Sequence, residues 1–303
     1  MAKIVLAGGT GNLGKLLIPA FNRKDKEIIV LTRKKMMKHH PGLDFALWDG
    51  ENLGEWCEAL EDADLLINLS GESINKRFTP KNKKLLYDSR ILPTQTLGRA
   101  LQNLQNPPKM WINFSGVSIF NGAASMQDES SSDYGDDFLA ELSKAWEAAC
   151  LSAETPKTKK VIVRMSPILS KNSGMFAELK PLAKFGLAGR MGSGKQYMPW
   201  IHEDDFIRLI LWIAEQENPE GIYHACSPNP EQNKDFMRIL RKGIGMPIGL
   251  PQPAIVAKVG AFLKGLDPAL LLQTAPVTTN VTLKNGFTFN FPYLHDAINQ
   301  LVK

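Results

Sequence analysis

Short apolar runs alternate with amphipathic stretches along the first 165 or so residues of the chain. The runs are rich in β-branched residues and apolar at consecutive positions, as in parallel strands buried on both faces. The stretches between them repeat apolar residues at helical spacing, most clearly at 93–104 and 137–150. We therefore expect strands at residues 3–8, 27–32, 45–48, 65–69, 110–114 and 160–164.

This alternation predicts an α/β fold, a doubly wound parallel Rossmann sheet covered by helices on both faces. Beyond residue 170, Gly and Pro become frequent and the helix-like pieces are separated by loops. We therefore predict a Rossmann core at 1–169 and a smaller C-terminal substrate lobe at 170–303. The lobe region should return one further strand to the sheet near 221–225.

The composition fits a soluble globular protein, with 44% hydrophobic and 22% charged residues among 303. No apolar stretch approaches the roughly 20 residues that span a bilayer, and we expect no secretory signal. The three cysteines, Cys57, Cys150 and Cys226, form no CxxC pair. They predict reduced thiols, a cytoplasmic location and no metal site.

The net charge of +5 comes partly from basic groups at 23–26, 33–35 and 81–84. No nucleic-acid-binding motif accompanies them, so we predict neither a nucleic-acid nor a membrane partner. A local field that attracts a phosphorylated cofactor is sufficient to explain them. A small-molecule substrate and an oligomer both remain open.

Three glycines, Gly8, Gly11 and Gly14, follow the first apolar run and precede the helix-like segment 15–21. Glycine permits the tight strand-to-helix turn and the close approach of the backbone to a pyrophosphate. The N–H groups at the start of the following helix then hold the anion. This position in the chain predicts a dinucleotide site.

The end of the second predicted strand indicates which dinucleotide binds. NAD-specific sites usually carry an acidic residue there, which bonds the ribose 2′-hydroxyl. Here the chain reads Thr32-Arg33-Lys34-Lys35. Arg33 can pair with a 2′-phosphate and Thr32 can donate its hydroxyl, so we expect NADP(H) rather than NAD.

Several strings together resemble the extended short-chain dehydrogenase/reductase superfamily, and within it the epimerase-like 39U subgroup of sugar-nucleotide epimerase-like proteins. The resemblance covers essentially the whole chain. The strings that carry it are Gly8-Gly-Thr-Gly-Asn-Leu-Gly14, Val30-Leu-Thr-Arg33, Asn68-Leu-Ser-Gly-Glu-Ser-Ile74, Ser89-Arg90, Phe138-Leu-Ala, Trp146-Glu147, Gly192-Ser-Gly-Lys-Gln196, Trp200-Ile-His202, Asp205 and Asn285-Gly-Phe-Thr-Phe-Asn-Phe-Pro292.

The resemblance implies NADP(H) binding by residues at strand ends and on one helix. Those expected at the pyrophosphate are Gly8, Thr10, Gly11, Asn12 and Leu13, and those at the 2′-phosphate are Thr32 and Arg33. Asn68, Leu69 and Ser70 would line the adenosine and ribose, although Asn68 and Ser70 equally fit a buried turn. Arg90 would reach a phosphate or ribose, or else form a surface salt bridge.

Catalysis in this superfamily usually rests on a Tyr-x-x-x-Lys pair that moves a proton during hydride transfer. The corresponding helix has Lys144, but the residue four positions earlier is Ala140. A register shifted by one residue places Leu139 and Ser143 there instead, so neither register restores the pair. We expect Lys144 to be an exposed helix lysine.

Hydroxyl groups near the end of the fifth predicted strand are the remaining candidates. Ser115 and Ser118 can hydrogen-bond a substrate oxygen. The neighbouring Tyr134 lies in a polar loop, where we expect a solvated side chain. In the lobe, Gln196 and Trp200 are candidates for substrate contact, whereas His202 and Asp205 more readily explain hydrogen bonds that fix the lobe to the sheet.

The sequence thus favours an NADP(H)-binding epimerase- or reductase-like protein that acts on a carbonyl or sugar-like metabolite. Its catalytic acid would be an atypical group such as Ser115, Ser118, a lobe residue or water. The alternative is a catalytically silent NADP(H)-binding protein with a redox-responsive or assembly role, which the missing pair favours. A standard NAD-type epimerase would require the absent tyrosine.

Overall fold

The fold is built around a seven-stranded parallel sheet in a computed structural model that describes residues 2–22, 26–34, 42–217, 219 and 221–303. The strand order is β10-β6-β5-β4-β1-β2-β3, which reverses direction at β1 as in a doubly wound fold. The strands are β1 Ala2–Ala7, β2 Lys26–Thr32, β3 Leu43–Leu47, β4 Leu65–Asn68, β5 Met110–Gly116, β6 Lys159–Met165 and β10 Gly221–Ala225. The predicted fold class and the predicted strands are confirmed.

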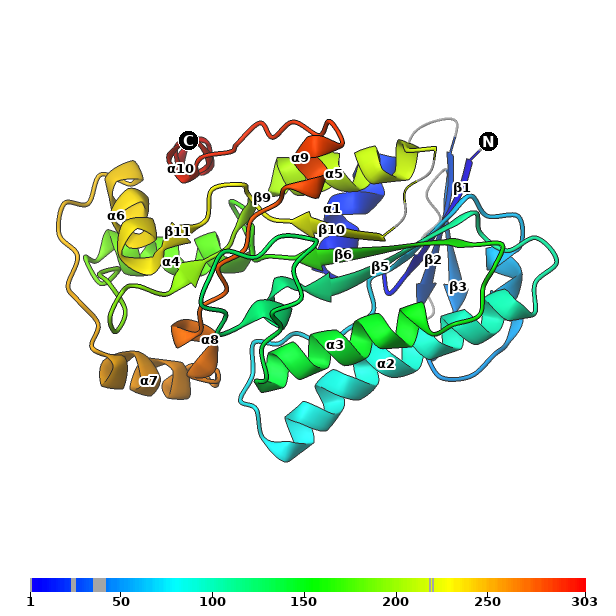
Figure 1. Cartoon of the computed structure of the whole chain (residues 1–303), viewed down its shortest axis with the longest axis horizontal. Helices are drawn as coiled ribbons and strands as arrows, with labels where there is room; N and C mark the ends of the chain where they lie inside the picture. The colour runs from blue at the N-terminus through cyan, green and yellow to red at the C-terminus, as the bar shows by residue number, and fades with distance from the viewer. Residues whose placement is uncertain (1, 23–25, 35–41, 218, 220) are drawn as a thin grey trace.

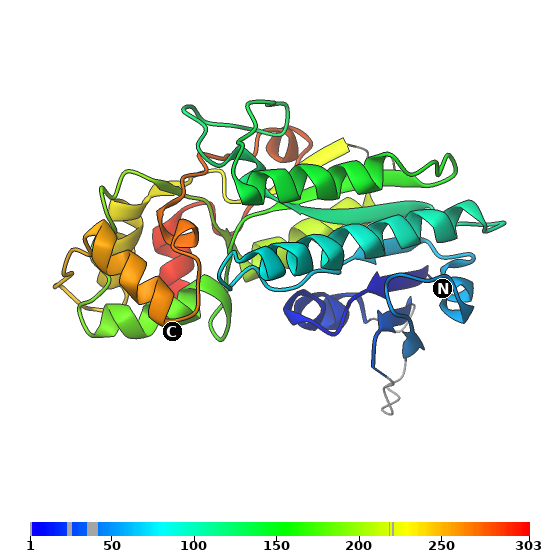
Figure 2. The same ribbon diagram turned by 90° about the horizontal axis from the view of Figure 1, so that it is seen from below.

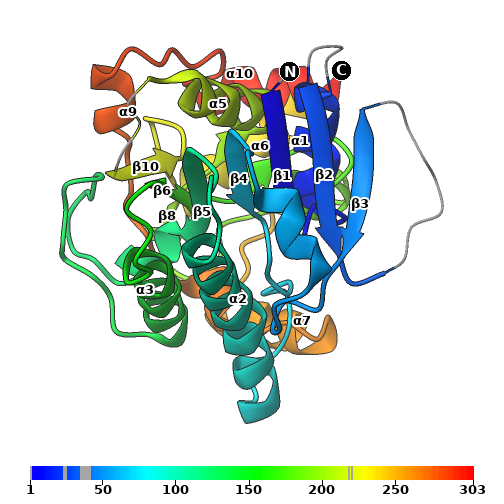
Figure 3. The same cartoon turned by 90° about the vertical axis from the view of Figure 1, so that its right-hand side faces the viewer.

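Helices cover both faces of the sheet (Figures 1 and 3). The helices α2 Pro80–Gln102 and α3 Phe138–Leu151 pack side by side on one face. The helices α1 Asn12–Phe21 and α5 Glu203–Glu215 pack on the other, where Leu17, Phe206 and Leu209 are fully buried. Continuous apolar strands follow directly from burial on both faces.

The helix α2 begins thirteen residues before the predicted 93–104 segment. Thr79 caps its N-terminus by accepting a hydrogen bond from the Asn82 N–H, and Pro80 occupies the first turn, where a missing N–H costs nothing. Pro93 lies inside the helix, buried against the backbone of Gly50. A proline inside a helix usually ends or kinks it, so tertiary packing must stabilise α2 at this position.

The C-terminal half builds a second layer at one end of the sheet (Figure 2). Its core includes Leu169, Phe176, Trp200, Phe236 and Leu301. Its other elements are β7 Ile168–Leu169, α4 Gly174–Lys184, β8 Tyr197–Met198, β9 Ile201–His202, β11 Glu231–Gln232, α6 Asn233–Gly243, α7 Ala254–Leu263, α8 Ala269–Leu272, α9 Val281–Lys284 and α10 Leu294–Val302; two 3-10 turns, η1 Glu55–Leu60 and η2 Val117–Phe120, lie in the first half.

Among the described residues, no helix combines the length and the apolar character needed to cross a bilayer. The basic groups predicted at 23–26 and 33–35 lie partly outside the described residues, while 81–84 falls in the first turns of α2. The division of the chain at residue 169 stays a prediction.

Candidate functional site

The glycine turn between β1 and α1 separates two roles of its glycines. Gly8 has a φ of +76°, and its N–H donates to the Leu31 carbonyl at 3.0 Å. A Cβ atom on Gly14 would lie 1.7 Å from the Gly9 oxygen, so Gly14 lets the helix pack on the turn. A Cβ atom on Gly11 would meet, within 4 Å among the described residues, only the Gly8 oxygen, at 3.8 Å.

The space in front of Gly11 is therefore open at the N-terminus of α1. Gly11 caps this helix, and its neighbours Thr10 and Asn12 are exposed. Helix N-terminal N–H groups carry partial positive charge and bind phosphate oxygens. The turn thus fits a pyrophosphate group, with Gly8 supplying the bend and Leu13 half-buried behind it.

The end of β2 brings the two predicted 2′-phosphate ligands to the same sheet edge. Thr32 is buried, and its hydroxyl accepts a hydrogen bond from the Lys34 N–H at 3.3 Å. Arg33 is exposed, and its Nη2 lies 3.7 Å from the Glu72 carboxylate. Because this ion pair is loose and solvated, Arg33 is free to exchange Glu72 for a phosphate.

Asn68, at the end of β4, is a structural connector. Its amide donates to Thr94 Oγ1 at 2.9 Å and Asn113 Oδ1 at 2.7 Å, while its oxygen accepts from the Ser70 N–H. The Leu69 N–H donates to Ala7. These bonds connect the ends of β1 and β4 to the middle of β5 and the middle of α2.

Ser70 lies against the glycine turn. Its hydroxyl is buried without a hydrogen-bond partner among the described residues, and the site of a Cβ on Gly8 is 3.1 Å from it. Ser70 can therefore still donate or accept a hydrogen bond next to the glycine turn.

Arg90 reaches the same sheet edge from beneath. It is 9% exposed and donates to the carbonyls of Leu86 at 3.1 Å and Glu72 at 2.9 Å. Its guanidinium lies 5.1 Å from the Trp146 ring. Burial lowers the pKa of Arg90 to about 10, which still leaves it charged at neutral pH. Arg90 therefore supports the segment after β4 rather than forming a surface salt bridge.

A buried polar network replaces the absent Tyr-x-x-x-Lys pair beside the end of β5. The Ser115 hydroxyl donates to Glu147 Oε1 at 2.7 Å. Arg164 donates to both oxygens of the same carboxylate, through Nε at 2.8 Å and Nη2 at 2.9 Å. Arg164 also donates to the Tyr134 hydroxyl at 3.0 Å. Four groups from β5, α3, β6 and one loop thus meet.

The sheet register explains why Ser115 and Arg164 lie together. Ser115 on β5 pairs with Arg164 on β6, which pairs in turn with His224 on β10, so all three occupy one row under α3. Burial alone lowers the pKa of Arg164, but the Glu147 carboxylate outweighs it and raises that pKa. The Nη1 group of Arg164 has no hydrogen-bond partner among the described residues, so it can still donate a hydrogen bond.

Tyr134 is 39% exposed, in agreement with the solvated loop position that the sequence predicts, but it also has contacts that the sequence did not predict. Its ring packs 5.4 Å from the Phe120 ring, and the Arg164 guanidinium lies 5.2 Å from it. The loop is tied down by Gly135, whose N–H donates to Ile119. The hydroxyl is therefore fixed at the network.

The helix α3 presents Ser143 and Glu147, one turn apart, to the end of β5. The Ser143 hydroxyl lies 3.1 Å from that of Ser118 and donates to the Leu139 carbonyl. Lys144 instead forms a surface pair with Glu141 at 2.7 Å. Neither lysine nor tyrosine therefore occupies the inner face of α3.

The candidates in the lobe lie apart from this network. Trp200 is fully buried in the lobe core, and Gln196 donates to the Met191 carbonyl at 3.0 Å. Gln196 also lines a shallow hollow of about 410 Å³ with Gly192, Ser193, Lys195, Ala254, Leu272 and Thr274.

His202 and Asp205 hold the C-terminal segment, as the sequence favours. His202 caps α5, bonds Gln300 at 3.0 Å and stacks on Phe291 with ring centroids 4.0 Å apart. The buried Asp205 carboxylate accepts the N–H groups of Asn290 and Phe291, both at 2.8 Å. Both side chains have structural partners.

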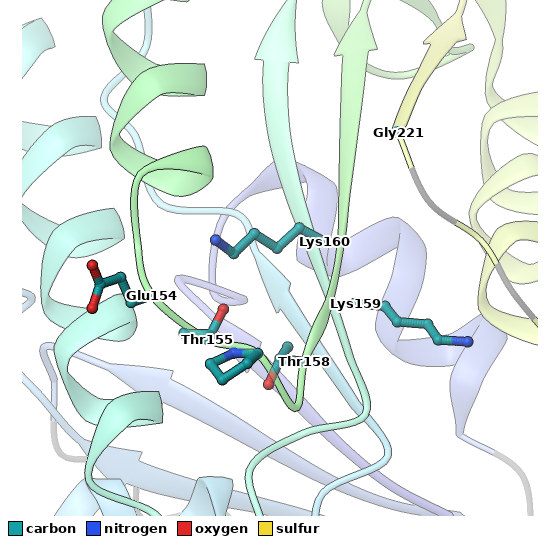
Figure 4. Close-up of a pocket in the computed structure, with 7 residues that line it drawn as sticks. Glu154, Thr155, Thr158, Lys159, Lys160 and Gly221 are labelled. Carbon is teal, nitrogen blue, oxygen red and sulfur yellow. The ribbon is translucent and has the colours of Figure 1, made fainter.

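A larger depression of about 590 Å³ lies at the opposite edge of the sheet (Figure 4). Lys159 and Gly221, which line it, are the first residues of β6 and β10. Lys160 bonds the Leu151 and Ala153 carbonyls. Ligands of doubly wound sheets bind at the carboxyl ends of the strands, so this depression is not the cofactor site.

Comparison with known proteins places the chain in a family. The pattern described as the NAD dependent epimerase/dehydratase family matches residues 4–226. An epimerase family protein of Staphylococcus saprophyticus is 31% identical over the full length of both chains. The epimerase family protein SDR39U1 of Bos taurus is 30% identical over 99% of each chain.

A solved structure agrees with these relatives. The crystal structure of human SDR39U1 with NADPH has a TM-score of 0.86 and 27% sequence identity, and the match covers 99% of this chain and 98% of the human one. The glycine turn, the sheet order and these full-length matches lead to one assignment. The chain belongs to the NAD-dependent epimerase/dehydratase family of extended short-chain dehydrogenases/reductases, in agreement with its resemblance to the 39U subgroup.

Proposed function

We propose that this protein binds NADP(H) across the carboxyl ends of β1, β2 and β4. The observation that carries this proposal is the open N-terminus of α1 at Gly11, with the cation Arg33 at the end of β2. The human relative that shares this fold was crystallised with NADPH. Gly11 and its neighbours would hold the pyrophosphate, and Thr32 and Arg33 the 2′-phosphate.

Replacing Arg33 by glutamate is expected to weaken NADPH binding at least tenfold more than NADH binding. The substitution removes a phosphate partner and adds a charge that repels the 2′-phosphate, which NADH lacks. Calorimetric titration of the purified protein with each dinucleotide, after removal of any carried-through cofactor, measures both affinities.

Lys34→Glu is the matched control, because it makes the same charge change at the next exposed position. Equal losses for NADPH and NADH in Arg33→Glu would show that Arg33 does not contact the 2′-phosphate. Failure of the unsubstituted protein to bind either dinucleotide would overturn the cofactor proposal itself.

We further propose an oxidoreductase or epimerase-like activity on a carbonyl or sugar-like metabolite. NADPH bound here would supply a hydride. Tyr134 would donate a hydrogen bond to the reacting oxygen, and Arg164 would stabilise negative charge on the Tyr134 oxygen, 3.0 Å from its Nη2. Residues 170–303 would supply the walls of the substrate site.

The activity proposal predicts that Tyr134→Phe lowers kcat/KM by about 100-fold or more, the usual range for loss of a general acid. NADPH consumption with a panel of aldehydes, ketones and quinones gives the assay. Tyr87→Phe is the control. Tyr87 is not part of this network, so the variant should retain activity.

Turnover that is unchanged in Tyr134→Phe would remove Tyr134 from the chemistry. Tight NADPH binding without turnover of any compound would favour the alternative, a catalytically silent NADP(H)-binding protein. That alternative is supported by the Glu147 carboxylate, whose oxygens already bond Ser115 and Arg164. The cysteines are unpaired, which supports the cytoplasm as the proposed location.

A further inference from the structure

The helix α7 is almost entirely apolar, yet most of its surface faces solvent. Its large apolar side chains have exposed fractions between 48% and 79%. These side chains, which we call the α7 patch, are Ile255, Val256, Val259, Phe262 and Leu263. A helix that is apolar all round is normally buried, so an exposed one indicates a surface that something else covers.

Small residues and polar anchors hold α7 in place, so its exposure is built into the fold. Only Ala257 and Ala261 of this helix are buried. The Arg77 guanidinium lies 3.6 Å from the Phe262 ring centroid and donates to the Phe262 carbonyl at 2.6 Å. The Phe78 N–H donates to Asp267 at 3.0 Å, just beyond the helix.

These anchors place the α7 patch beside the carboxyl edge of the sheet. Arg77 and Phe78 belong to the segment that leaves β4 after Ser70 and Glu72. The patch therefore borders the side of the molecule where the dinucleotide is proposed to bind. Figures 1 and 2 show α7 on the outer side of the lobe.

The apolar surface continues into the segments next to α7. Phe185 is 80% exposed and Ile248 is 61% exposed, and the two segments are joined by a hydrogen bond from the Leu250 N–H to the Gly186 carbonyl. The Gln252 side chain bonds the Leu187 carbonyl and so joins the same two segments again, two residues before α7 begins at Ala254.

The charges around the α7 patch are mainly positive. The exposed basic residues of α7 and the adjoining segments are Lys184, Arg190, Lys195, Lys242, Lys258 and Lys264. The acidic residues there are Glu178, Asp267 and Asp235, and they pair with Lys264, the Phe78 N–H and Arg238 respectively. A second copy docked about a twofold axis would bring these lysines close to their equivalents, whereas an anionic surface would complement them.

We propose that the α7 patch docks the protein on an anionic lipid surface. The apolar side chains enter the boundary between headgroups and acyl chains, while Lys258 and Lys264 contact the headgroups. The contact is peripheral and needs no bilayer-spanning helix, and it departs from the sequence-based prediction of no membrane partner because it rests on the exposure of α7, which the sequence does not show. It places the carboxyl edge of the sheet next to the lipid. A carbonyl compound dissolved in the membrane would then have direct access to the proposed substrate site.

Co-sedimentation with vesicles tests this proposal. We expect the full-length protein to sediment with vesicles of equal parts phosphatidylcholine and phosphatidylglycerol, much less with phosphatidylcholine alone, and less at high salt. Val259→Glu/Leu263→Glu should reduce the bound fraction at least tenfold, because it places two carboxylates at the interface. Leu151→Glu changes a leucine at the end of α3 that is 53% exposed, close to the 54% of Val259, and should bind as the unsubstituted protein does.

Several results would overturn the proposal. One is that the unsubstituted protein stays in solution with both kinds of vesicle, and another is that the double variant sediments as well as the unsubstituted protein. A dimer in sedimentation velocity that the double variant dissociates, together with no vesicle binding, would identify a second copy as the occupant instead. Retained NADPH affinity in the double variant confirms that it is folded.

Discussion

Replacing Gly11 by valine is expected to weaken NADPH binding by more than about 100-fold, a loss of about 2.7 kcal/mol. The valine side chain would project into the open space at the N-terminus of α1, where only the Gly8 oxygen lies nearby among the described residues. It would occupy the place of the pyrophosphate without striking the protein. Calorimetric titration measures the loss, and denaturant unfolding should give a free energy of unfolding within about 0.5 kcal/mol of the unsubstituted protein.

Gly14→Ala is the contrasting variant, because its added Cβ points into the protein, whereas that of Gly11→Val points into open space. The new Cβ would be 1.7 Å from the Gly9 oxygen, so the helix and the turn must separate. We expect a measurable loss of folding stability in this variant, in addition to weaker binding. If Gly11→Val bound NADPH with unchanged affinity, the glycine turn would not be the pyrophosphate site.

The sheet could be predicted from the sequence because each strand carries its own signal. Parallel strands buried on both faces read as continuous apolar runs. The run Lys3–Gly8, followed by Gly11 and Gly14, indicates both a strand and a dinucleotide-binding turn. The start of α2 was not predictable in this way. The first turns of α2, which contain Lys81, Lys83 and Lys84, show no apolar residues at helical spacing. Pro93 predicts a helix boundary, but the packed helix continues through it.

The polar network beside β5 could not be predicted because it depends on tertiary pairing. Glu147 and Arg164 are separated by seventeen positions and meet only when α3 packs on the β5–β6 pair. One signal was present in the sequence. Arg164 directly follows the apolar run 161–163 of β6, and a buried charge in that position requires a partner. Tyr134 lies thirty positions from Arg164 in a polar loop, and no local pattern predicts their contact.

The loop that carries Tyr134 is fixed by a second carboxylate that the sequence did not reveal. Glu129 is buried and accepts from the hydroxyl of Thr279 at 2.6 Å and from the N–H groups of Asn280 and Val281. Burial alone raises the pKa of Glu129, but His224 and these donors outweigh it and lower that pKa. The loop is thus tied to the C-terminal half at one end and to Arg164 at the other.

Replacing Glu147 by alanine is expected to lower the free energy of unfolding by about 3–5 kcal/mol. The substitution leaves Arg164, whose side chain is fully buried, without the carboxylate that it bonds through Nε and Nη2, and leaves the Ser115 hydroxyl without an acceptor. An uncompensated buried charge is the costly part of this change. Denaturant unfolding followed by circular dichroism measures the difference.

Two further variants separate this cause from a general weakening of α3. Lys144→Ala, one turn earlier on the same helix, breaks only a surface pair with Glu141 and should cost about 0.2–1 kcal/mol. Glu147→Leu/Arg164→Met removes both charges and should recover much of the loss, since apolar residues of similar volume can replace a buried ion pair. A cost for Glu147→Ala as small as that for Lys144→Ala would mean that water or another group compensates Arg164. A double variant no more stable than Glu147→Ala would mean that the network contributes through its hydrogen-bond geometry rather than through its charge balance.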